Sequence, residues 1–141
     1  MTLAGRTAIV TGSCGSGIGR STALCLARDG ANIVLDYGTC RHGPDSRAAA
    51  ERIVGAIGQL GARATIEEAD TTDERQVGAL VEVARREFGH VDILVNNAGG
   101  PFQVRDFTEI PLRDWQDVLA AELNGPFLLM KHVVFLGFPG T

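Results

Sequence analysis

Short strand-like segments alternate with longer helix-like segments along this chain of 141 residues, and the alternation limits its possible folds more than any other feature. The predicted strands are residues 7–11, 32–36, 63–68 and 92–96, and the predicted helices are residues 18–29, 45–60, 72–88 and 111–132. Connections between parallel strands are right-handed, which places helices on both faces of the sheet. The pattern therefore predicts an α/β fold with one doubly wound parallel sheet in the strand order 3-2-1-4, over residues 1–141.

The charge and composition argue against several kinds of partner. The net charge is −4 and no run of basic residues is present, so nothing marks a surface for nucleic acid. No segment reaches the roughly 18 consecutive apolar residues that a membrane span needs, and the N-terminus lacks a long apolar signal segment. The cysteines and histidines show no metal-type spacing. We therefore expect no nucleic acid, no membrane and no metal, and a cytoplasmic location.

A glycine-rich segment, Thr11-Gly-Ser-Cys-Gly-Ser-Gly-Ile-Gly19, joins the first predicted strand to the first predicted helix. Glycines let a ligand approach the backbone closely, and the N–H groups and dipole of a helix N-terminus attract a pyrophosphate. A tight turn without a ligand would also use glycines, and it is the position after the first strand that favours a dinucleotide site. Ile18 also begins the helix face that is predicted to be buried. The candidate cofactor contacts are Gly12, Ser13, Gly15, Gly17, Ile18 and Gly19.

This glycine-rich segment, together with Asn96-Asn-Ala-Gly99 after the fourth predicted strand, resembles the N-terminal half of the short-chain dehydrogenase/reductase family. The resemblance covers about residues 5–131. It implies a Rossmann-like NAD(P)-binding domain and an oxidoreductase that interconverts carbonyls and alcohols by hydride transfer. One departure is that four residues separate Gly12 from Gly17 where the family usually has three, so the turn must accommodate an extra residue.

The resemblance also implies cofactor contacts at the ends of two strands. Asp70 and Thr71, after the third strand, correspond to the family's contact with the adenine ring. The corresponding contacts after the fourth strand are Asn97, Ala98 and Gly99, where small residues leave room for a ribose. From the residues alone, Asp70 can instead open the following turn, with Thr72 or Asp73 capping the next helix.

The choice between NAD and NADP depends on the end of the second strand, where an acid that binds the ribose hydroxyls favours NAD. Asp36 fits that description, but the family's discriminating position falls on Tyr37, so Asp36 can point away from the ribose. Arg41 can meet a 2′-phosphate. The expected cofactor is therefore NADP or NAD, with a preference for NADP.

The family's catalytic residues have no counterpart in this chain. The family uses a Ser and a Tyr-x-x-x-Lys pair in which the Lys lowers the pKa of the Tyr. Here Tyr37 is the one tyrosine and Lys131 the one lysine. Glu122 stands where the family has an Asn in its long helix, either as a variant active-site residue or as a solvated or packing carboxylate. We therefore expect a cofactor-binding half that is inactive alone, and the alternative is a non-catalytic dinucleotide-binding or interaction module.

The resemblance further predicts an incomplete domain, because the family continues into a fifth strand, the catalytic helix and a substrate loop. Without a fifth strand, residues 92–96 would form an exposed apolar edge that invites pairing with another chain. In the last helix, Trp115 with Leu112, Val118 and Leu119 is expected to face the core. We expect a homo-oligomer or a self-associating chain, with a small-molecule substrate only where the remaining half is supplied.

Overall fold

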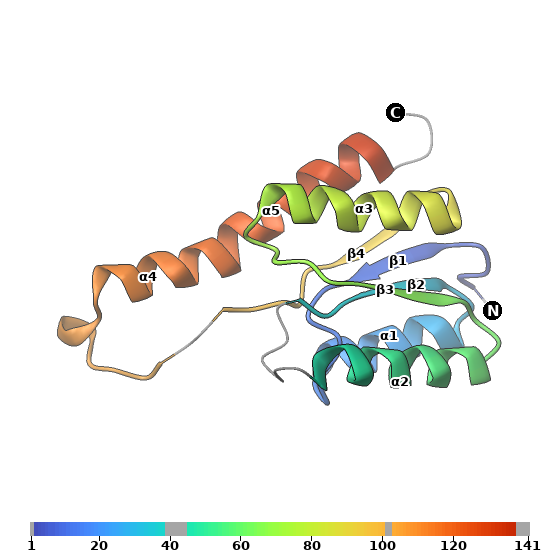
Figure 1. Cartoon of the computed structure of the whole chain (residues 1–141), viewed down its shortest axis with the longest axis horizontal. Helices are drawn as coiled ribbons and strands as arrows, with labels where there is room; N and C mark the ends of the chain where they lie inside the picture. Colours follow the sequence, from blue (N-terminus) through green and yellow to red (C-terminus); the bar gives the residue numbers. More distant parts are fainter. Residues whose placement is uncertain (1, 39–44, 101–102, 138–141) are drawn as a thin grey trace.

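The computed structural model, which describes residues 2–38, 45–100 and 103–137, is built on one parallel sheet (Figure 1). Its strands are β1 (Thr7–Val10), β2 (Asn32–Asp36), β3 (Ala64–Glu67) and β4 (Ile93–Val95). They lie in the order β3-β2-β1-β4, and all neighbouring pairs are parallel. The predicted α/β class and strand order are confirmed, and each strand lies within its predicted segment.

Helices cover both faces of this sheet. They are α1 (Ile18–Arg28), α2 (Ser46–Gln59), α3 (Glu74–Phe88), α4 (Leu112–Leu119) and α5 (Gly125–His132), with a 3-10 turn, η2 (Phe107–Glu109), before α4. Figure 1 shows α1 and α2 on one face, and α3 and α5 on the other. The sheet is therefore doubly wound, as predicted.

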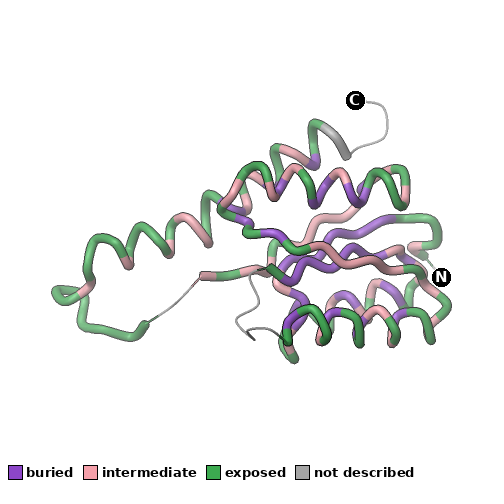
Figure 2. Tube along the Cα trace, in the orientation of Figure 1, coloured by how far each residue is buried: buried purple, intermediate pink, exposed green. Residues whose placement is uncertain are grey.

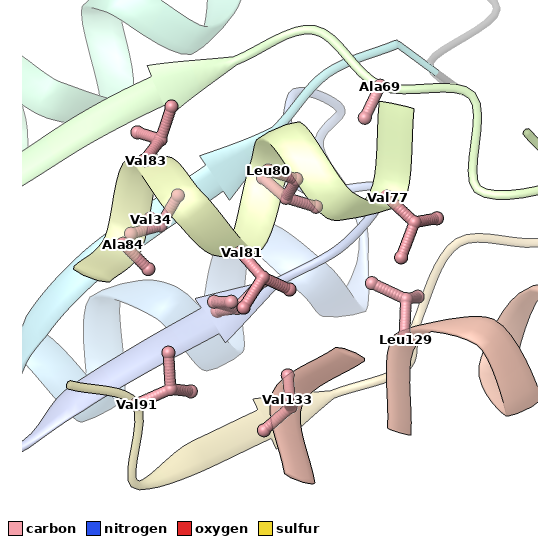
Figure 3. Close-up of a cluster of buried hydrophobic side chains, with 11 residues drawn as sticks. Val34, Ala69, Val77, Leu80, Val81, Val83, Ala84, Val91, Leu129 and Val133 are labelled. Carbon is pink, nitrogen blue, oxygen red and sulfur yellow. The ribbon is translucent and has the colours of Figure 1, made fainter. Parts of the chain in front are cut away.

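Side chains that alternate along the strands divide the core into two layers. On β1, Ala8 and Val10 belong to one layer and Ile9 belongs to the other. The first layer lies against α1 and α2, where the buried residues are Ala23, Ala27, Ile53 and Ile57. The second layer, drawn in Figure 3, includes Val77, Leu80, Val81, Leu129 and Val133 from α3 and the last helix. Because both faces of β1 and β2 are covered, their sequences are apolar without alternation.

Helix α3 has a cap at each end. The carboxylate of Asp73 accepts hydrogen bonds from the backbone N–H groups of Arg75 and Gln76, at 2.9 and 3.3 Å. A hydrogen bond from the Gln76 side chain, together with these two backbone bonds, lowers the pKa of Asp73. At the other end Gly89 adopts a left-handed conformation with φ of 89°. The sequence-based alternative that Asp73 caps this helix is confirmed.

The last helix is longer and less regular than the predicted segment 111–132. Helix α4 continues through a π-helical segment, η3 (Ala120–Asn124), into α5, and a second π-helical segment, η4 (Val133–Gly137), follows. Pro126 accounts for η3, because proline has no N–H to donate to the carbonyl of the preceding turn and a wider turn shifts the hydrogen-bond register.

This helix buries a different stripe from the predicted one. Leu129 and Val133 belong to the core layer at α3, whereas Leu112, Trp115 and Leu119 are 69%, 50% and 37% exposed. Figure 2 shows α4 extending beyond the sheet, and no residue of this fully described helix is buried. The prediction that the Trp115 stripe faces the core is wrong, because the N-terminal half of the helix has no described part of the sheet beside it.

The stretch Leu112–Phe135 is long and apolar enough to cross a membrane by length and composition, and 22% of its most apolar window is buried. The sequence predicted no such segment, because no uninterrupted run reaches about 18 apolar residues.

Candidate functional site

Two loops meet at the carboxyl edge of the sheet. Residues 11–17 connect β1 to α1, and residues 96–100 follow β4. Because β1 and β4 are parallel neighbours, both loops leave the sheet at the same edge. Ligands of open α/β sheets bind at this edge, where the strand order reverses, and in the order β3-β2-β1-β4 that point lies between β1 and β4.

Asn97 fastens the two loops together. Its side-chain nitrogen donates to the carbonyl oxygens of Thr11 and Gly12, at 2.9 and 3.0 Å. The Thr11 hydroxyl accepts from the N–H groups of Asn97 and Ala98, both at 3.0 Å, and donates to the Val95 carbonyl at 3.2 Å. The structure thus brings the predicted residues Gly12, Asn97 and Ala98 together. The sequence interpretation missed Thr11, whose only signal is its place directly before the first glycine.

Packing requires two of the glycines and leaves a third in open space. Gly12 has φ of +61°, and a Cβ there would lie 2.8 Å from the Cα of Ala98. A Cβ on Gly19 would lie 2.5 Å from the side-chain nitrogen of Asn97. At Gly17, directly before α1, a Cβ would have no neighbour within 4 Å. The space in front of the first turn of α1 therefore stays open beside free backbone donors, and a pyrophosphate fits that arrangement.

Asp36 lies fully buried at the end of β2. Its carboxylate accepts hydrogen bonds from the backbone N–H groups of Gly12, Gly38 and Ala69, at 3.2, 2.9 and 3.2 Å. One side chain thereby joins the glycine-rich turn to the ends of β2 and β3. The carboxylate points into the protein, as the family position of Tyr37 suggested.

The glycine-rich turn, which is one residue longer than is usual in the family, is buried at Ser13 and Cys14 and more open at Gly15 and Ser16. Ser13 is fully buried, and both its N–H group and its hydroxyl donate to the Asp36 carbonyl, at 3.1 and 3.2 Å. Cys14 is 4% exposed, whereas Gly15 is half-buried and Ser16 is exposed. Ser13, a predicted cofactor contact, thus has its hydrogen bonds to β2.

Two other predicted residues, Ile18 and Tyr37, lie around this turn. Ile18 is 77% exposed, so its assignment to the buried face of α1 is wrong, because the first helical turn borders the open edge of the sheet. Tyr37 is buried against Cys14 and Ala50, and burial raises the pKa of its phenol. Arg41 lies outside the described residues.

Asp70 and Thr71 are neighbours in the sequence, but Asp70 is exposed and Thr71 is buried. One oxygen of the exposed Asp70 carboxylate accepts from the N–H group and the hydroxyl of Thr72, at 2.8 and 2.7 Å. This is the turn-opening role that the residues alone allowed. Thr71 is 2% exposed and packs against Gly125. A Cβ on Gly125 would lie 3.2 Å from both the carbonyl oxygen and the hydroxyl oxygen of Thr71. Thr71 therefore lies against the last helix.

Glu122 reaches the loop after β4 from the π-helical segment η3. Its carboxylate accepts a hydrogen bond from the Gly100 N–H group at 3.0 Å. A Cβ on Gly99 would lie 2.8 Å from the same carboxylate oxygen. The structure thus brings Glu122 to the candidate site, where it holds the loop that carries Gly99.

The structure does not bring the one tyrosine and the one lysine together. Tyr37 packs beside α2, while the Lys131 ammonium donates to Glu74 of α3 at 2.7 Å. Lys131, together with His132, lowers the pKa of Glu74. Because α2 and α3 cover opposite faces of the sheet, the sheet itself separates the phenol from the ammonium.

A cavity of about 450 Å³ adjoins the glycine-rich turn, between α1 and α2. Its lining residues are Cys14, Gly15, Ser16, Arg20, Asp45, Ala49, Arg52 and Ile53. The sequence interpretation missed both arginines. The position of Arg20 directly after the last glycine of the turn was the one available signal, and nothing in the sequence connects Arg52 to this turn.

Comparison with known proteins places this fold and site in a family. A family model described as short chain dehydrogenase matches residues 6–136. The chain is 34% identical to the cyclohexanol dehydrogenase of Acinetobacter sp. and 36% identical to glucose 1-dehydrogenase 2 of Bacillus subtilis. Each match covers 92% of this chain, but only 48% and 47% of the relatives. The chain therefore spans about half the length of these curated relatives.

Solved structures agree with the sequence matches. A blue fluorescent protein from a metagenomic library, crystallised in complex with NADPH, superposes with a TM-score of 0.86 at 33% identity. A Serratia marcescens short-chain dehydrogenase/reductase mutant superposes with a TM-score of 0.85 at 27% identity. Both matches cover 97% of this chain and 53% of the other. Matched over residues 6–136 and carrying the sheet order and Rossmann-like fold described above, the chain belongs to the short-chain dehydrogenase/reductase family of oxidoreductases.

Proposed function

We propose that this chain binds a nicotinamide dinucleotide, as the cofactor-binding half of an oxidoreductase that interconverts carbonyls and alcohols by hydride transfer. The open space at Gly17 is the observation that carries the proposal. Internal packing accounts for Gly12 and Gly19, but it leaves the space before the first turn of α1 unfilled. The family match and the NADPH complex of the similar structure support the same cofactor class.

The chain's own residues would bind and orient the cofactor. The N–H groups at the start of α1 would donate to the pyrophosphate, while the exposed Ile18 borders the same opening. Asn97 holds Ala98 and Gly99 beside the turn, where their small size leaves room for a ribose. A bound nicotinamide would supply the hydride donor or acceptor. Asp70 would border the adenine side, with one carboxylate oxygen not used by Thr72.

We also propose that NADP is preferred over NAD. An acid at the end of β2 favours NAD when it accepts hydrogen bonds from the ribose hydroxyls. Here the buried carboxylate of Asp36 accepts from three backbone N–H groups instead, so it does not reach a ribose at the surface. The similar structure that contains NADPH supports this preference.

The residues of this chain do not supply the family's proton transfer, and we propose that the chain alone has no turnover. The phenol of Tyr37 is buried beside α2, and Lys131 pairs with Glu74 on the opposite face. Glu122 touches the loop after β4, but its hydrogen bond to Gly100 gives it a positioning role. The same observations favour the second candidate function, a non-catalytic dinucleotide-binding module.

Calorimetry and absorbance assays test the proposal. Residues 1–141 are titrated with NADPH and with NADH, and the nicotinamide absorbance is followed in the presence of cyclohexanol, cyclohexanone and glucose. We expect saturable cofactor binding without turnover. Absence of binding by both cofactors at millimolar concentration would refute the cofactor site, and robust turnover would refute the proposed inactivity. Turnover that appears only when the C-terminal half of a relative is added would favour the oxidoreductase half over the non-catalytic module.

We propose in addition that the chain is cytoplasmic and self-associates. The exposed apolar residues of the last helix are Leu112, Trp115, Leu119, Leu123, Phe127, Met130, Val134 and Phe135. Among the described strands, β4 has β1 as its single neighbour, so its other edge is unpaired. Leu129 and Val133 belong to the core layer at α3, which ties the helix to the folded domain and favours a protein interface over a membrane span.

A further inference from the structure

Two arginines line one cavity and have no partner of opposite charge among the described residues. Arg20 lies in the first turn of α1, and Arg52 lies in the middle of α2. Both line the cavity of about 450 Å³ beside the glycine-rich turn. Neither side chain forms a hydrogen bond or ion pair within the described part of the chain, although most of the other described arginines do.

The charges around this cavity favour an anion. The two guanidinium groups carry one positive charge each, and the Asp45 carboxylate in the lining carries one negative charge, which leaves a net positive charge. The Ser16 hydroxyl adds a neutral hydrogen-bond donor. A guanidinium presents paired N–H groups that match two oxygens of a phosphate. A phosphate monoester, with nearly two negative charges at pH 7, is therefore the ligand chemistry that this lining fits best.

The position of the cavity indicates which phosphate it would hold. The pyrophosphate would occupy the space at Gly17, and Gly15 and Ser16 of the same turn line the cavity. The other wall is α2, the helix that follows β2. In a sheet of this kind the adenosine half of a dinucleotide lies on the side of β2. The cavity therefore adjoins the path from the pyrophosphate to the adenosine ribose.

We propose that Arg20 and Arg52 bind the 2′-phosphate of NADP in the cavity between α1 and α2, and that these two residues select NADP over NAD. The inference rests on the proposed cofactor function and assigns its specificity to named side chains. NAD carries a neutral hydroxyl in place of this phosphate, so it gains nothing from two guanidinium groups. Asp45 would oppose the phosphate and moderate the preference.

Calorimetric titration of the full chain tests the assignment with NADPH, NADH, adenosine 2′,5′-bisphosphate and adenosine 5′-monophosphate as probes. The variants are Arg20→Ala, Arg52→Ala and Asp45→Asn. Arg28→Ala serves as the control, because Arg28 is an exposed arginine in the last turn of α1, at the opposite end of the helix. Circular dichroism verifies that each variant is folded.

We expect each arginine variant to weaken NADPH and adenosine 2′,5′-bisphosphate about tenfold, the loss typical of a charge-assisted contact at a partly exposed site. NADH and adenosine 5′-monophosphate should keep their wild-type affinity. Asp45→Asn should strengthen NADPH binding, and Arg28→Ala should change nothing. The differences should shrink at 1 M salt, because exposed charges are screened.

Unchanged NADPH affinity in both arginine variants would overturn the inference while leaving the proposed function intact. An equal loss for NADH would also overturn it, because the arginines would then serve a part common to both cofactors. If the wild-type chain bound neither NADPH nor NADH, the proposed function would fail separately. In that case adenosine 2′,5′-bisphosphate still tests the anion site. Binding of this probe that depends on Arg20 and Arg52 would support the site, and absence of binding would refute it.

Discussion

Asp36 offers the sharpest test of how the site is held together. If its carboxylate acts as a structural link, Asp36→Asn should lower the free energy of unfolding and should not weaken NADH binding selectively. One carboxylate oxygen accepts from Gly38 and Ala69, and the other accepts from Gly12. An asparagine oxygen can keep the first two hydrogen bonds, but its NH₂ group then faces the Gly12 N–H group, which is a donor as well. One acceptor is lost at a fully buried position.

The magnitude follows from the number of stranded N–H groups. Leaving one buried donor unpaired costs about 1–3 kcal/mol, and the Gly12 N–H group is partly buried, so Asp36→Asn should lower the free energy of unfolding by about 1 kcal/mol. Asp36→Ala removes the acceptor of all three donors, of which the Ala69 N–H group is buried while those of Gly12 and Gly38 are partly open to water, so its cost should exceed that of Asp36→Asn and reach about 3 kcal/mol. That is a large part of the roughly 5–15 kcal/mol that holds a typical domain folded, so the alanine variant should unfold at a clearly lower urea concentration than the wild type.

Urea unfolding followed by circular dichroism measures both losses. Glu68→Gln is the matched control, because it also converts an acid to an amide near a strand end, but Glu68 is exposed. The control should change the unfolding free energy by less than about 0.5 kcal/mol. If Asp36→Asn were as stable as the control and weakened NADH binding selectively, the carboxylate would be a ribose ligand and the structural argument would be refuted.

Three further outcomes are expected. Gly19→Ala should destabilise the chain, since a Cβ would lie 2.5 Å from the side-chain nitrogen of Asn97. Gly17→Ala should fold normally and weaken cofactor binding, because a Cβ there would fill open space. Equal unfolding midpoints of the two variants in urea would contradict this difference. Burial raises the pKa of Asp92, but hydrogen bonds from a backbone N–H group and an arginine outweigh it and lower the pKa overall. Asp92 should therefore stabilise the fold above its unfolded pKa of about 3.9, and this contribution should vanish as the pH falls below that value and through the lower folded pKa. In urea titrations from pH 6 to 3, the free energy of unfolding should fall less for Asp92→Asn than for the wild type. Parallel falls in the two proteins would argue against a role of the Asp92 carboxylate. In sedimentation velocity the chain should self-associate and Leu123→Glu, at a position 63% exposed, should shift it towards monomer, while a monomeric wild type would exclude this interface.

Much of the fold could be read from local sequence patterns. The four apolar segments predicted as strands contain the four observed strands, because a strand covered on both faces needs an apolar run. Gly89 ends its helix as expected, since a left-handed residue is needed there. The last helix was predicted less well. Its π-helical segment depends on how a single proline is accommodated, and the buried stripe depends on which neighbours are present.

The candidate site divides in the same way. The glycine-rich turn and Asn97 could be recognised from residue type and order, because close backbone approach and amide hydrogen bonds demand those residues. The hydrogen bonds of Thr11 and the three N–H partners of the Asp36 carboxylate could not be recognised. Both depend on groups of another strand or loop, and a hydroxyl or carboxylate shows no partner in its own sequence neighbourhood.

The sequence by itself determined the α/β class, the strand order and the family, because these follow from periodicity and from a few glycine and asparagine positions. The tertiary structure decided that the Asp36 carboxylate accepts from three backbone N–H groups, that Tyr37 and Lys131 lie on opposite faces, and that Arg20 and Arg52 line one cavity. The physical reason is distance along the chain: local periodicity determines the elements, whereas contacts between residues of different elements exist only once the sheet has brought those elements together.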